Sequence, residues 1–393
     1  MAKYLKTIRV LNYSTHEEDC GIGKYQENFV RLIKGCDDIQ SDFYSTSPNI
    51  VKTLQGSALE SELSNFKNTL KDYDILHIQH EFGFYHGDGE GLKYITDIAQ
   101  SLNKKIVITM HTAPSLVYNN VTRYGSTPRA YAAYYRRVFQ RKKILNKRLL
   151  PLRAADTIIT LNSHTSQELI NIVGVNPQKI YQTLIPVEPN TSKSSNKVKL
   201  RHLMGAKDGD IILASIGFIS EKKGVDAAVR SLKFLPNKYK LAILGGINPV
   251  SGNPAVYDNL CDLIIDLNLE ERVYISGYIE NDKKLDELVS GVNLALYPYD
   301  PEYYKLASSA AINIAINNGV PALSYPAESF KEINRYVPDT ITITPSPNFY
   351  ELVRAIKQTD FERQDKSAEL YKEKYNINVI SENILNLYRG LMN

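Results

Sequence analysis

The sequence predicts an α/β protein made of two doubly wound parallel sheets, and three observations lead to this prediction. The chain has 393 residues, and globular domains usually contain roughly 100–200, which favours two domains. Short β-branched apolar runs alternate with helical patterns along the chain, as is typical of parallel sheets. A polar stretch at 186–198, without apolar periodicity, separates the two halves and indicates a linker.

Apolar periodicity in the first half predicts five strands, at Thr7–Leu11, Ile75–Gln79, Ile106–Met110, Thr157–Leu161 and Ile180–Leu184. The helices predicted between them include Gly23–Ile33, Ser57–Leu70 and Ser163–Ile172. The second half predicts six strands, at Ile211–Ile216, Leu241–Leu244, Val273–Ser276, Leu294–Tyr297, Ala322–Ser324 and Ile341–Ile343. Its predicted helices include Lys223–Leu232, Tyr257–Leu267, Asp282–Val289, Ala307–Ile316 and Tyr350–Gln358.

The predicted domains are residues 1–187 and 188–375, followed by a terminal helix at 376–393. In that helix, apolar residues recur at steps of three and four, which places them on one face. Ligands of doubly wound sheets bind beyond the carboxyl ends of the strands. Two such domains facing each other would therefore form the site in an interdomain cleft.

Composition excludes several classes of protein. Hydrophobic residues make up 43% and charged residues 23% of the chain, which excludes a mostly disordered protein. The net charge of +4 is close to balance and does not favour nucleic acid binding. The three cysteines form no CxxC pair, which favours a reducing compartment and no zinc site. The N-terminus lacks the apolar region of a signal peptide, so we expect a cytoplasmic protein.

Two glycines, Gly21 and Gly23, lie between the first strand and the first helix. Glycine lets a backbone approach a ligand closely, and a helix N-terminus favours negative charge. The third glycine of the dinucleotide-binding pattern is absent. Both an anion site and a plain tight turn remain open here.

Polar residues also follow two other strands of the first half. His80 and Glu81 come after the strand at Ile75–Gln79 and can bind hydroxyls or shift protons. A structural hydrogen-bonding role is the equal alternative, and their spacing with His86 matches no metal-binding pattern. His111 ends the next strand, where it can donate to a sugar hydroxyl or stabilise developing charge.

Two segments of the second half are candidates for binding an anion. Gly217, Lys222 and Lys223 lie between a strand and a helix, where a lysine can neutralise a diphosphate. At Ser308–Ala311, small residues open a predicted helix, so that the backbone N–H groups of Ser309, Ala310 and Ala311 would face an anion. The alternatives are a solvated lysine pair and a simple helix cap.

The segment 115–155 contains ten Lys and Arg residues, no Asp or Glu, and several interleaved aromatic residues. This pattern suits an anionic membrane surface or an anionic acceptor. A solvated basic helix is the alternative. Nucleic acid has no supporting fold motif.

Taken in order, these motifs resemble retaining glycosyltransferases of the GT-B fold, in glycosyltransferase family 4. The motifs that carry the resemblance are Gly21-Ile22-Gly23, His111, Ala154–Ile159, Ile185-Pro186, Lys223-Gly224 and Gly319-Val320-Pro321. His80–Gly83 and Ser308-Ser309 are similar to one subset of that family. The resemblance implies two Rossmann-like domains, with the terminal helix crossing back onto the first.

The resemblance also implies roles for the candidate residues. A nucleotide-sugar would be the donor, with a glycan or lipid-linked saccharide as acceptor and with no metal or further cofactor. Donor contacts would come from Gly21, Gly23, Gly217, Lys222, Lys223, Ser308, Ser309, Ala310 and Ala311. His80 and His111 would contact the acceptor or the transferred sugar, and the catalytic residues would be His111, Lys223 and Glu81. Separately from the resemblance, the basic segment 115–155 would contact the inner face of the cell membrane.

The sequence departs from the family pattern at three positions. Phe218 stands where the family has an arginine, and Leu306 and Ile314 stand where it has a pair of glutamates. Lys222, Glu302 and Lys305 are the nearest candidates to replace the missing charges. Two alternatives therefore stay open, a non-catalytic GT-B protein that binds a glycan or a partner, and a nucleotide-sugar epimerase.

Overall fold

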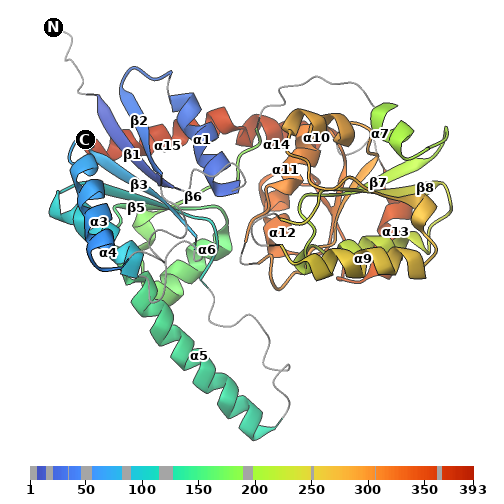
Figure 1. Ribbon diagram of the computed structural model, residues 1–393, viewed down its shortest axis with the longest axis horizontal. Coiled ribbons are helices and arrows are strands. Elements are labelled where there is room, and N and C mark those ends of the chain that lie inside the picture. The colour runs from blue at the N-terminus through green and yellow to red at the C-terminus, as the bar shows by residue number, and fades with distance from the viewer. Residues whose placement is uncertain are drawn as a thin grey trace. The chain divides into compact units, whose positions relative to one another are not determined.

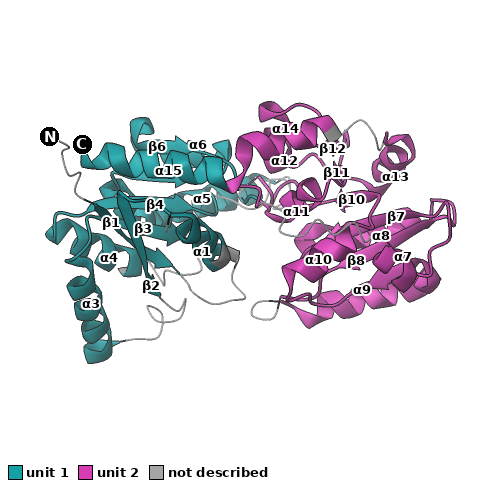
Figure 2. Ribbon diagram, turned by 90° about the horizontal axis from the view of Figure 1, so that it is seen from above, with its two compact units in different colours: residues 1–184, 306–308, 378–393 teal, residues 185–305, 309–377 magenta. Residues whose placement is uncertain are grey.

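The computed structural model contains two compact units, and each is described here by itself (Figure 2). Unit 1 comprises residues 1–184, 306–308 and 378–393, and unit 2 comprises residues 185–305 and 309–377. The structure describes residues 7–14, 21–33, 35–45, 55–81, 90–114, 127–188, 198–248, 252–305, 307–360 and 365–393.

Unit 1 contains a six-stranded parallel sheet in the order β2-β1-β3-β4-β5-β6. The strands are β1 (Ile8–Ser14), β2 (Ile39–Ser45), β3 (Ile75–His80), β4 (Lys105–Met110), β5 (Thr157–Thr160) and β6 (Ile180–Gln182). The helices are α1 (Gly21–Ile33), α3 (Gly56–Leu70), α4 (Glu90–Ser101), α5 (Pro128–Leu149), α6 (Ser163–Glu168) and α15 (Ile377–Met392) (Figure 1).

The two faces of the unit 1 sheet differ in chemistry. One face is apolar, and Leu76 and Ile78 of β3 pack there with Phe66 of α3 and Ile95 of α4. The opposite face carries buried polar side chains at alternating strand positions, because successive strand residues point to opposite faces. These are Asn12, Ser41, His77, Gln79 and Thr109. Helices α1 and α15 contribute side chains to this polar face.

Unit 2 contains a second six-stranded parallel sheet, in the order β12-β11-β10-β7-β8-β9. The strands are β7 (Ile211–Ile216), β8 (Tyr239–Leu244), β9 (Val273–Ile275), β10 (Leu294–Tyr297), β11 (Ala322–Ser324) and β12 (Thr342–Ile343). Counted within the unit, this is the 3-2-1-4-5-6 order of doubly wound nucleotide-binding sheets. The order of the strands reverses between β7 and β10.

The helices of unit 2 pack around this sheet and form a largely apolar core. They are α7 (Val198–Leu203), α8 (Val225–Leu232), α9 (Pro254–Asp266), α10 (Asp282–Val289), α11 (Ala311–Asn317), α12 (Glu328–Tyr336), α13 (Phe349–Gln358) and α14 (Asp365–Tyr375). Leu213 of β7 and Leu241 of β8 share one apolar cluster with Val229 of α8 and Leu352 of α13. None of the described helices has the length and hydropathy needed to cross a bilayer.

The predicted fold class, two doubly wound parallel α/β domains, is confirmed. The structure adds a strand, β2, that periodicity did not predict. Its sequence IQSDFYS is half polar and pairs only with β1, so it lacks the continuous apolar run of a central strand. Helices α4, α7, α12 and α14 were also not predicted, and the predicted linker lies mostly outside the described residues.

Candidate functional site

The point where the strand order of unit 2 reverses is the first candidate site, because doubly wound sheets bind ligands beyond the strand ends at such a point. Gly217 directly follows β7, and Tyr299 lies two residues beyond β10. Gly217 has a φ of +103°, in the region that favours glycine. The carboxyl ends of β7 and β10 therefore lie next to each other, and no side chain at Gly217 fills the space beside them.

Lys223 reaches this strand edge. Its Nζ lies 5.8 Å from the centre of the Tyr299 ring and 5.9 Å from that of Phe218. A Cβ built on Gly217 would lie 2.9 Å from the Lys223 Nζ and 3.4 Å from the Ala311 Cβ. The structure thus brings together three of the predicted donor contacts, Gly217, Lys223 and Ala311.

The Lys223 ammonium forms no hydrogen bond or ion pair with any described residue. Burial lowers its pKa from 10.5 to about 8, because a charged amine loses hydration there. At pH 7 the group is still mostly protonated. It is therefore a partly buried cation near two aromatic rings, without a carboxylate to balance its charge, and such a cation favours an anionic ligand.

A single glycine fixes the turn that carries Lys223. Residues Glu221–Lys223 form one 3-10 turn, and Gly224 follows with a φ of +59°. A Cβ on Gly224 would lie 2.0 Å from the carbonyl oxygen of Pro298, far inside van der Waals contact. Only glycine lets the turn pack this closely against the residues that follow β10.

The other charged candidates in this region are paired with neighbours. The Lys222 Nζ lies 3.9 Å from the Asp300 carboxylate, and the Lys305 Nζ lies 2.8 Å from that of Glu302. Glu302 and Lys305, which sequence analysis named as substitutes for the missing charges, thus neutralise each other. Phe218, at the position of the missing arginine, stacks on Tyr278 with 5.8 Å between ring centres.

The four residues predicted to begin a helix, 308–311, are divided between the two units: residue 308 belongs to unit 1 and residues 309–311 to unit 2. Helix α11 begins at Ala311, four residues later than predicted. The Ser308 hydroxyl donates to the Leu161 carbonyl at 3.1 Å and accepts from the Asn162 amide at 3.0 Å, within unit 1. Ser309 belongs to unit 2, where its Oγ lies 3.5 Å from the Tyr299 hydroxyl.

The second candidate site is the carboxyl edge of the unit 1 sheet. His111 follows β4, and its Nε2 lies 2.8 Å from the Gln79 Oε1. Gln79 donates to Gln26, and Gln26 donates to Asn12, which donates in turn to the Ser41 hydroxyl at 2.6 Å. Four of these side chains come from α1, β1, β2 and β3, and together with the half-buried His111 after β4 they form one continuous network.

A branch of the same network reaches the last helix. The His77 Nε2 lies 2.8 Å from the Thr109 hydroxyl, and its Nδ1 lies 2.6 Å from the hydroxyl of Tyr388 in α15. Burial lowers the pKa of His77 and of His111 to about 3 and that of His80 to about 4. The three imidazoles are therefore neutral at physiological pH, so they act as hydrogen-bonding groups and not as charges.

The remaining candidates of unit 1 lie near this edge. Glu81 accepts a hydrogen bond of 2.6 Å from the Thr112 hydroxyl, and the His80 carbonyl accepts one of 3.1 Å from the His111 amide. Gly21 and Gly23 lie in the first turn of α1, and the residues before them, like Phe82, Gly83 and His86, lie outside the described residues. No group of acidic, histidine or cysteine side chains in the described ranges could hold a metal ion.

The amide network was not predicted, although the sequence carried a signal for it. Asn12 lies in β1, which continues past the end of the predicted strand. His77 and Gln79 lie two residues apart in β3, so their side chains point to the same face. A strand inside a doubly wound sheet is normally apolar on both faces. Polar residues at every second position of such a strand indicate a buried hydrogen-bonding face.

Residues 198–376 match the family of group 1 glycosyl transferases. A D-inositol 3-phosphate glycosyltransferase of Xylanimonas cellulosilytica is 22% identical over 221 residues. That match spans 54% of this chain and about half, 49%, of the relative.

Two solved structures resemble the whole chain. Anabaena HepE in complex with UDP has a TM-score of 0.70 at 14% identity, covering 98% of this chain and 100% of that one. Sucrose-phosphate synthase of Thermosynechococcus elongatus has a TM-score of 0.68 at 16% identity, with 98% and 99% covered. These likenesses show the two-domain GT-B fold, and the family match supports a glycosyltransferase.

Proposed function

We propose that this protein is a retaining glycosyltransferase of family 4 that transfers a sugar from a nucleotide-sugar to a glycan or lipid-linked saccharide. The observation that carries the proposal is Lys223, a cation without a partner among the described residues, beside Gly217 at the point where the strand order reverses. This point lies in the part of the chain that matches the glycosyl transferase family. HepE, which shares the fold, has been crystallised with UDP and with UDP-glucose.

The chemistry of transfer explains why a cation is needed there. Breaking a sugar–phosphate bond leaves positive charge on the ring and negative charge on the departing diphosphate. A preorganised donor at such a centre is worth roughly 3–4 kcal/mol. In our proposal Lys223 supplies this stabilisation, so that the transfer of a hexose proceeds without a metal ion.

The polar groups of unit 1 have a different role in the proposal. His111 contacts the transferred sugar, and His80 and Glu81 contact hydroxyls of the sugar or the acceptor. With retention, the acceptor attacks from the face that the diphosphate leaves. This route needs no pair of carboxylates of the glycosidase type.

The test is a Lys223→Ala variant assayed for product with a panel of nucleotide-sugars. We expect turnover to fall about 100- to 1000-fold, the effect of removing one such donor. Lys284→Ala is the matched control, since it removes the same charge from an exposed position of unit 2. Unchanged turnover in Lys223→Ala would contradict the proposed role of the cation.

The departures from the family pattern favour one alternative, a GT-B protein that binds a nucleotide without transferring its sugar. Calorimetry with UDP separates the two functions. If the wild-type protein binds UDP, loses that binding in Lys223→Ala, and yields no product with any donor in the panel, the transferase proposal is wrong. Product formation that depends on an added acceptor supports it and excludes the epimerase.

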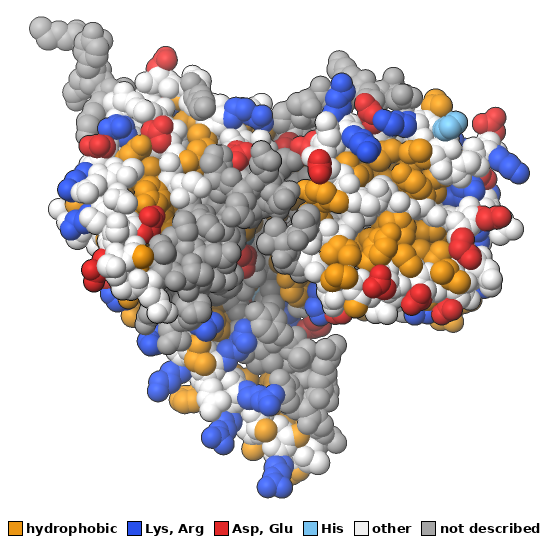
Figure 3. All heavy atoms as spheres, in the orientation of Figure 1, with side chains coloured by type: hydrophobic (Ala, Val, Ile, Leu, Met, Phe, Trp, Pro, Cys, Tyr) orange, Lys and Arg blue, Asp and Glu red, His pale blue; other side chains and the backbone are white. Residues whose placement is uncertain are grey.

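We also propose that α5 contacts an anionic membrane surface. From Pro128 to Ile144 no residue of this helix is buried. Tyr131, Tyr135 and Phe139 recur at steps of four, and Tyr135 and Phe139 are 65% and 72% exposed. Lys and Arg side chains line the same helix, and part of this basic surface is visible in Figure 3. Exposed aromatics surrounded by cations match the interface of an anionic bilayer.

Vesicle sedimentation tests this contact. The protein should bind vesicles that contain phosphatidylglycerol at low salt, should be released as the salt concentration rises, and should ignore pure phosphatidylcholine. Phe139→Ser should weaken binding several-fold, whereas Ile265→Ser, at an exposed apolar position of α9, should not. Absence of sedimentation with the anionic vesicles would overturn the proposal.

A further inference from the structure

The buried network of unit 1 has a direction, and one backbone group sets it. The Asn12 Nδ2 lies 3.0 Å from the backbone carbonyl of Asp42. A carbonyl oxygen can only accept, so the amide nitrogen of Asn12 must face it. The Oδ1 of Asn12 therefore faces Gln26, which must donate to it.

The constraint passes from one amide to the next. Because the Gln26 Nε2 donates to Asn12, its Oε1 faces Gln79 and accepts from the Gln79 Nε2. The Oε1 of Gln79 is then left facing His111, at 2.8 Å from the ring Nε2. An amide oxygen accepts, so the His111 Nε2 must carry a hydrogen. Asn12, Gln26 and Gln79 are all 0% exposed, so water cannot replace the links among these three amides.

We propose that Asn12, Gln26 and Gln79 are positioning residues that hold His111 as the Nε2–H tautomer, with its Nδ1 as a bare acceptor. Burial keeps the pKa of His111 near 3, so the ring carries only one proton at neutral pH. Its Nδ1 bonds to no described residue and is not among the buried polar atoms that lack a partner. The nitrogen that the network leaves unprotonated therefore has no hydrogen-bond partner among the described residues.

The same network sets His77 in the opposite tautomer. The Gln79 Nε2, already a donor, lies 3.3 Å from the His77 Nε2. Two N–H donors do not face each other, so the His77 Nε2 accepts, and the Thr109 hydroxyl donates to it as well. The proton of His77 must then lie on Nδ1 and be donated to the Tyr388 hydroxyl. These two neighbouring histidines therefore carry their protons on different ring nitrogens.

The consequence for catalysis rests on the proposed function. If His111 contacts the transferred sugar, its side chain accepts a hydrogen bond from a sugar hydroxyl and does not donate one. This reverses the donor role that the sequence suggested. The tautomer itself does not depend on the proposed function, so the two can fail separately.

Long-range ¹H–¹⁵N correlation of the full chain labelled in its seven histidines reads both tautomers directly. Substitution of His77 and His111 in turn assigns their signals. At pH 7 without ligand, we expect His111 to show a protonated Nε2 and an unprotonated Nδ1, and His77 to show the reverse. A protonated Nδ1 on His111, or the same tautomer on both rings, overturns the proposal on the wild-type protein alone.

Variants at Gln26, which hydrogen-bonds to neither histidine, test whether the direction is relayed. Gln26→Leu frees the Gln79 amide to rotate, so His111 should become a mixture of tautomers. Gln26→Glu keeps an acceptor oxygen facing Gln79 and should retain the wild-type pattern. Thr96→Val is the control, because this buried hydroxyl of α4 bonds only within its own helix, and it should change neither ring.

Kinetics separate this inference from the proposed function. With an active transferase, Gln26→Leu should lower kcat about tenfold while Gln26→Glu restores most of it. An unperturbed kcat in Gln26→Leu, together with a mixed tautomer, would show that the tautomer is irrelevant to transfer. If the wild-type protein transfers no sugar but shows the two expected tautomers, the proposed function fails and the network stands.

Discussion

The two units have sheets of the same kind but opposite chemistry at the points where their strand orders reverse. In unit 1 the reversal lies between β1 and β3, where neutral amides and imidazoles fill the covered face of the sheet. In unit 2 it lies between β7 and β10, where the face of β7 that packs against α8 carries Leu213 in an apolar cluster, and the strand edge carries Gly217 beside the Lys223 ammonium. The fold places a candidate site at each reversal of strand order. The side chains there decide whether that site orients hydrogen bonds, as in unit 1, or presents a charge, as in unit 2.

This difference explains how each site is kept in place. Unit 1 relies on side chains that satisfy one another, so each member depends on the next. Unit 2 relies on close backbone approach, because Gly224 packs on Pro298 and Gly245 packs on Gly217. We therefore expect unit 1 to be sensitive to the loss of polar side chains and unit 2 to the addition of a methyl group.

The largest expected effect tests the backbone packing of unit 2. Gly224→Ala should lower the free energy of unfolding by about 4 kcal/mol, from about 1–2 for the left-handed conformation and about 1–3 for the clash with the Pro298 carbonyl. Gly277→Ala is the matched control, since its φ is +69° but nothing lies near its Cβ position. It should lose only about 1–2 kcal/mol. Equal losses in urea unfolding followed by circular dichroism would contradict the role of close packing.

The next effect tests the polar face of unit 1. Gln26→Leu should cost about 3 kcal/mol, because it leaves both the Asn12 oxygen and the Gln79 amide buried without their partner. The comparison in unit 2 is Ser231→Ala, which removes a buried hydroxyl that bonds only within its own helix. That change should cost less than about 1 kcal/mol. A similar cost for both variants would mean that the network is no more cooperative than an isolated bond.

The pH dependence of nucleotide binding separates the cation of unit 2 from the neutral rings of unit 1. Lys223, with a pKa of about 8, loses its proton as the pH rises, and the anion prefers the protonated form. UDP affinity measured by calorimetry should therefore fall about tenfold between pH 7 and pH 9. The histidines stay neutral over this range, so any binding that survives in Lys223→Ala should show no such slope. The same slope in that variant would assign it to another group.

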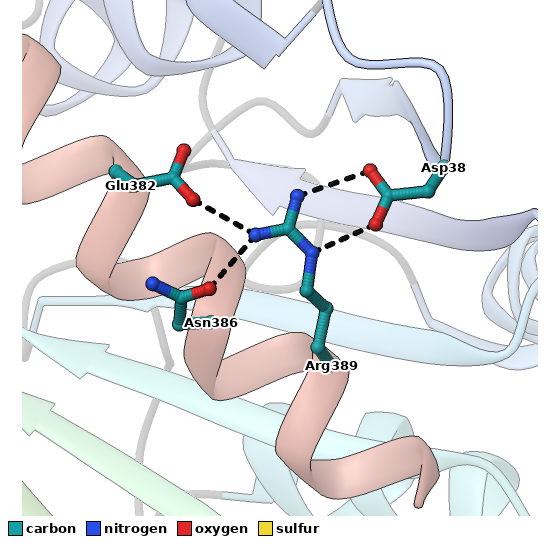
Figure 4. Close-up of polar contacts among 4 residues, drawn as sticks. All are labelled: Asp38, Glu382, Asn386 and Arg389. Atoms are coloured by element: carbon teal, nitrogen blue, oxygen red, sulfur yellow. Dashed lines mark hydrogen bonds and ion pairs between the residues drawn. The ribbon is translucent and has the colours of Figure 1, made fainter.

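The smallest expected effect on stability concerns the ion pair that joins α15 to the rest of unit 1. The Arg389 guanidinium donates to both oxygens of Asp38, at 2.7 and 3.0 Å, and also contacts Glu382 and Asn386 (Figure 4). Arg389→Ala should cost about 1 kcal/mol, because the pair is two-pronged but partly solvated. Lys199→Ala, which breaks the single contact with Glu287 in unit 2, should cost less than half as much.

The unfolding free energy measured at decreasing pH gives a second test of the pair between Arg389 and Asp38. The hydrogen bonds from Arg389 hold the pKa of Asp38 below its usual value of 3.8. A carboxyl with a lowered pKa stabilises the fold above its unfolded pKa, and this contribution disappears as the pH falls through the folded value. The difference in unfolding free energy between wild type and Arg389→Ala should thus be constant at neutral pH and shrink below about pH 4. A constant difference down to pH 2 would contradict the pairing.

The sequence by itself determined the fold class and the positions of the main candidates. Strand and helix periodicity is set by local burial, and that is why both sheets and most helices were predicted. His111 was found because it directly follows an apolar run, and Lys223 because it lies at the start of a predicted helix after a predicted strand. Both are local features of the sequence. The start of α11 was misplaced, since Ala307 to Ala310 have helical composition but make contacts outside the helix.

Only the tertiary structure decided which polar groups meet. His77 and Tyr388 are 311 residues apart, and no periodicity relates Asn12 to Gln26 and Gln79. Likewise, the sequence showed two adjacent lysines, but the fold pairs Lys222 with Asp300 and leaves Lys223 beside two aromatic rings. The pattern of apolar residues along the chain predicts which positions are buried. A hydrogen bond or an unbalanced charge instead depends on which distant residues the fold places within about 3–4 Å.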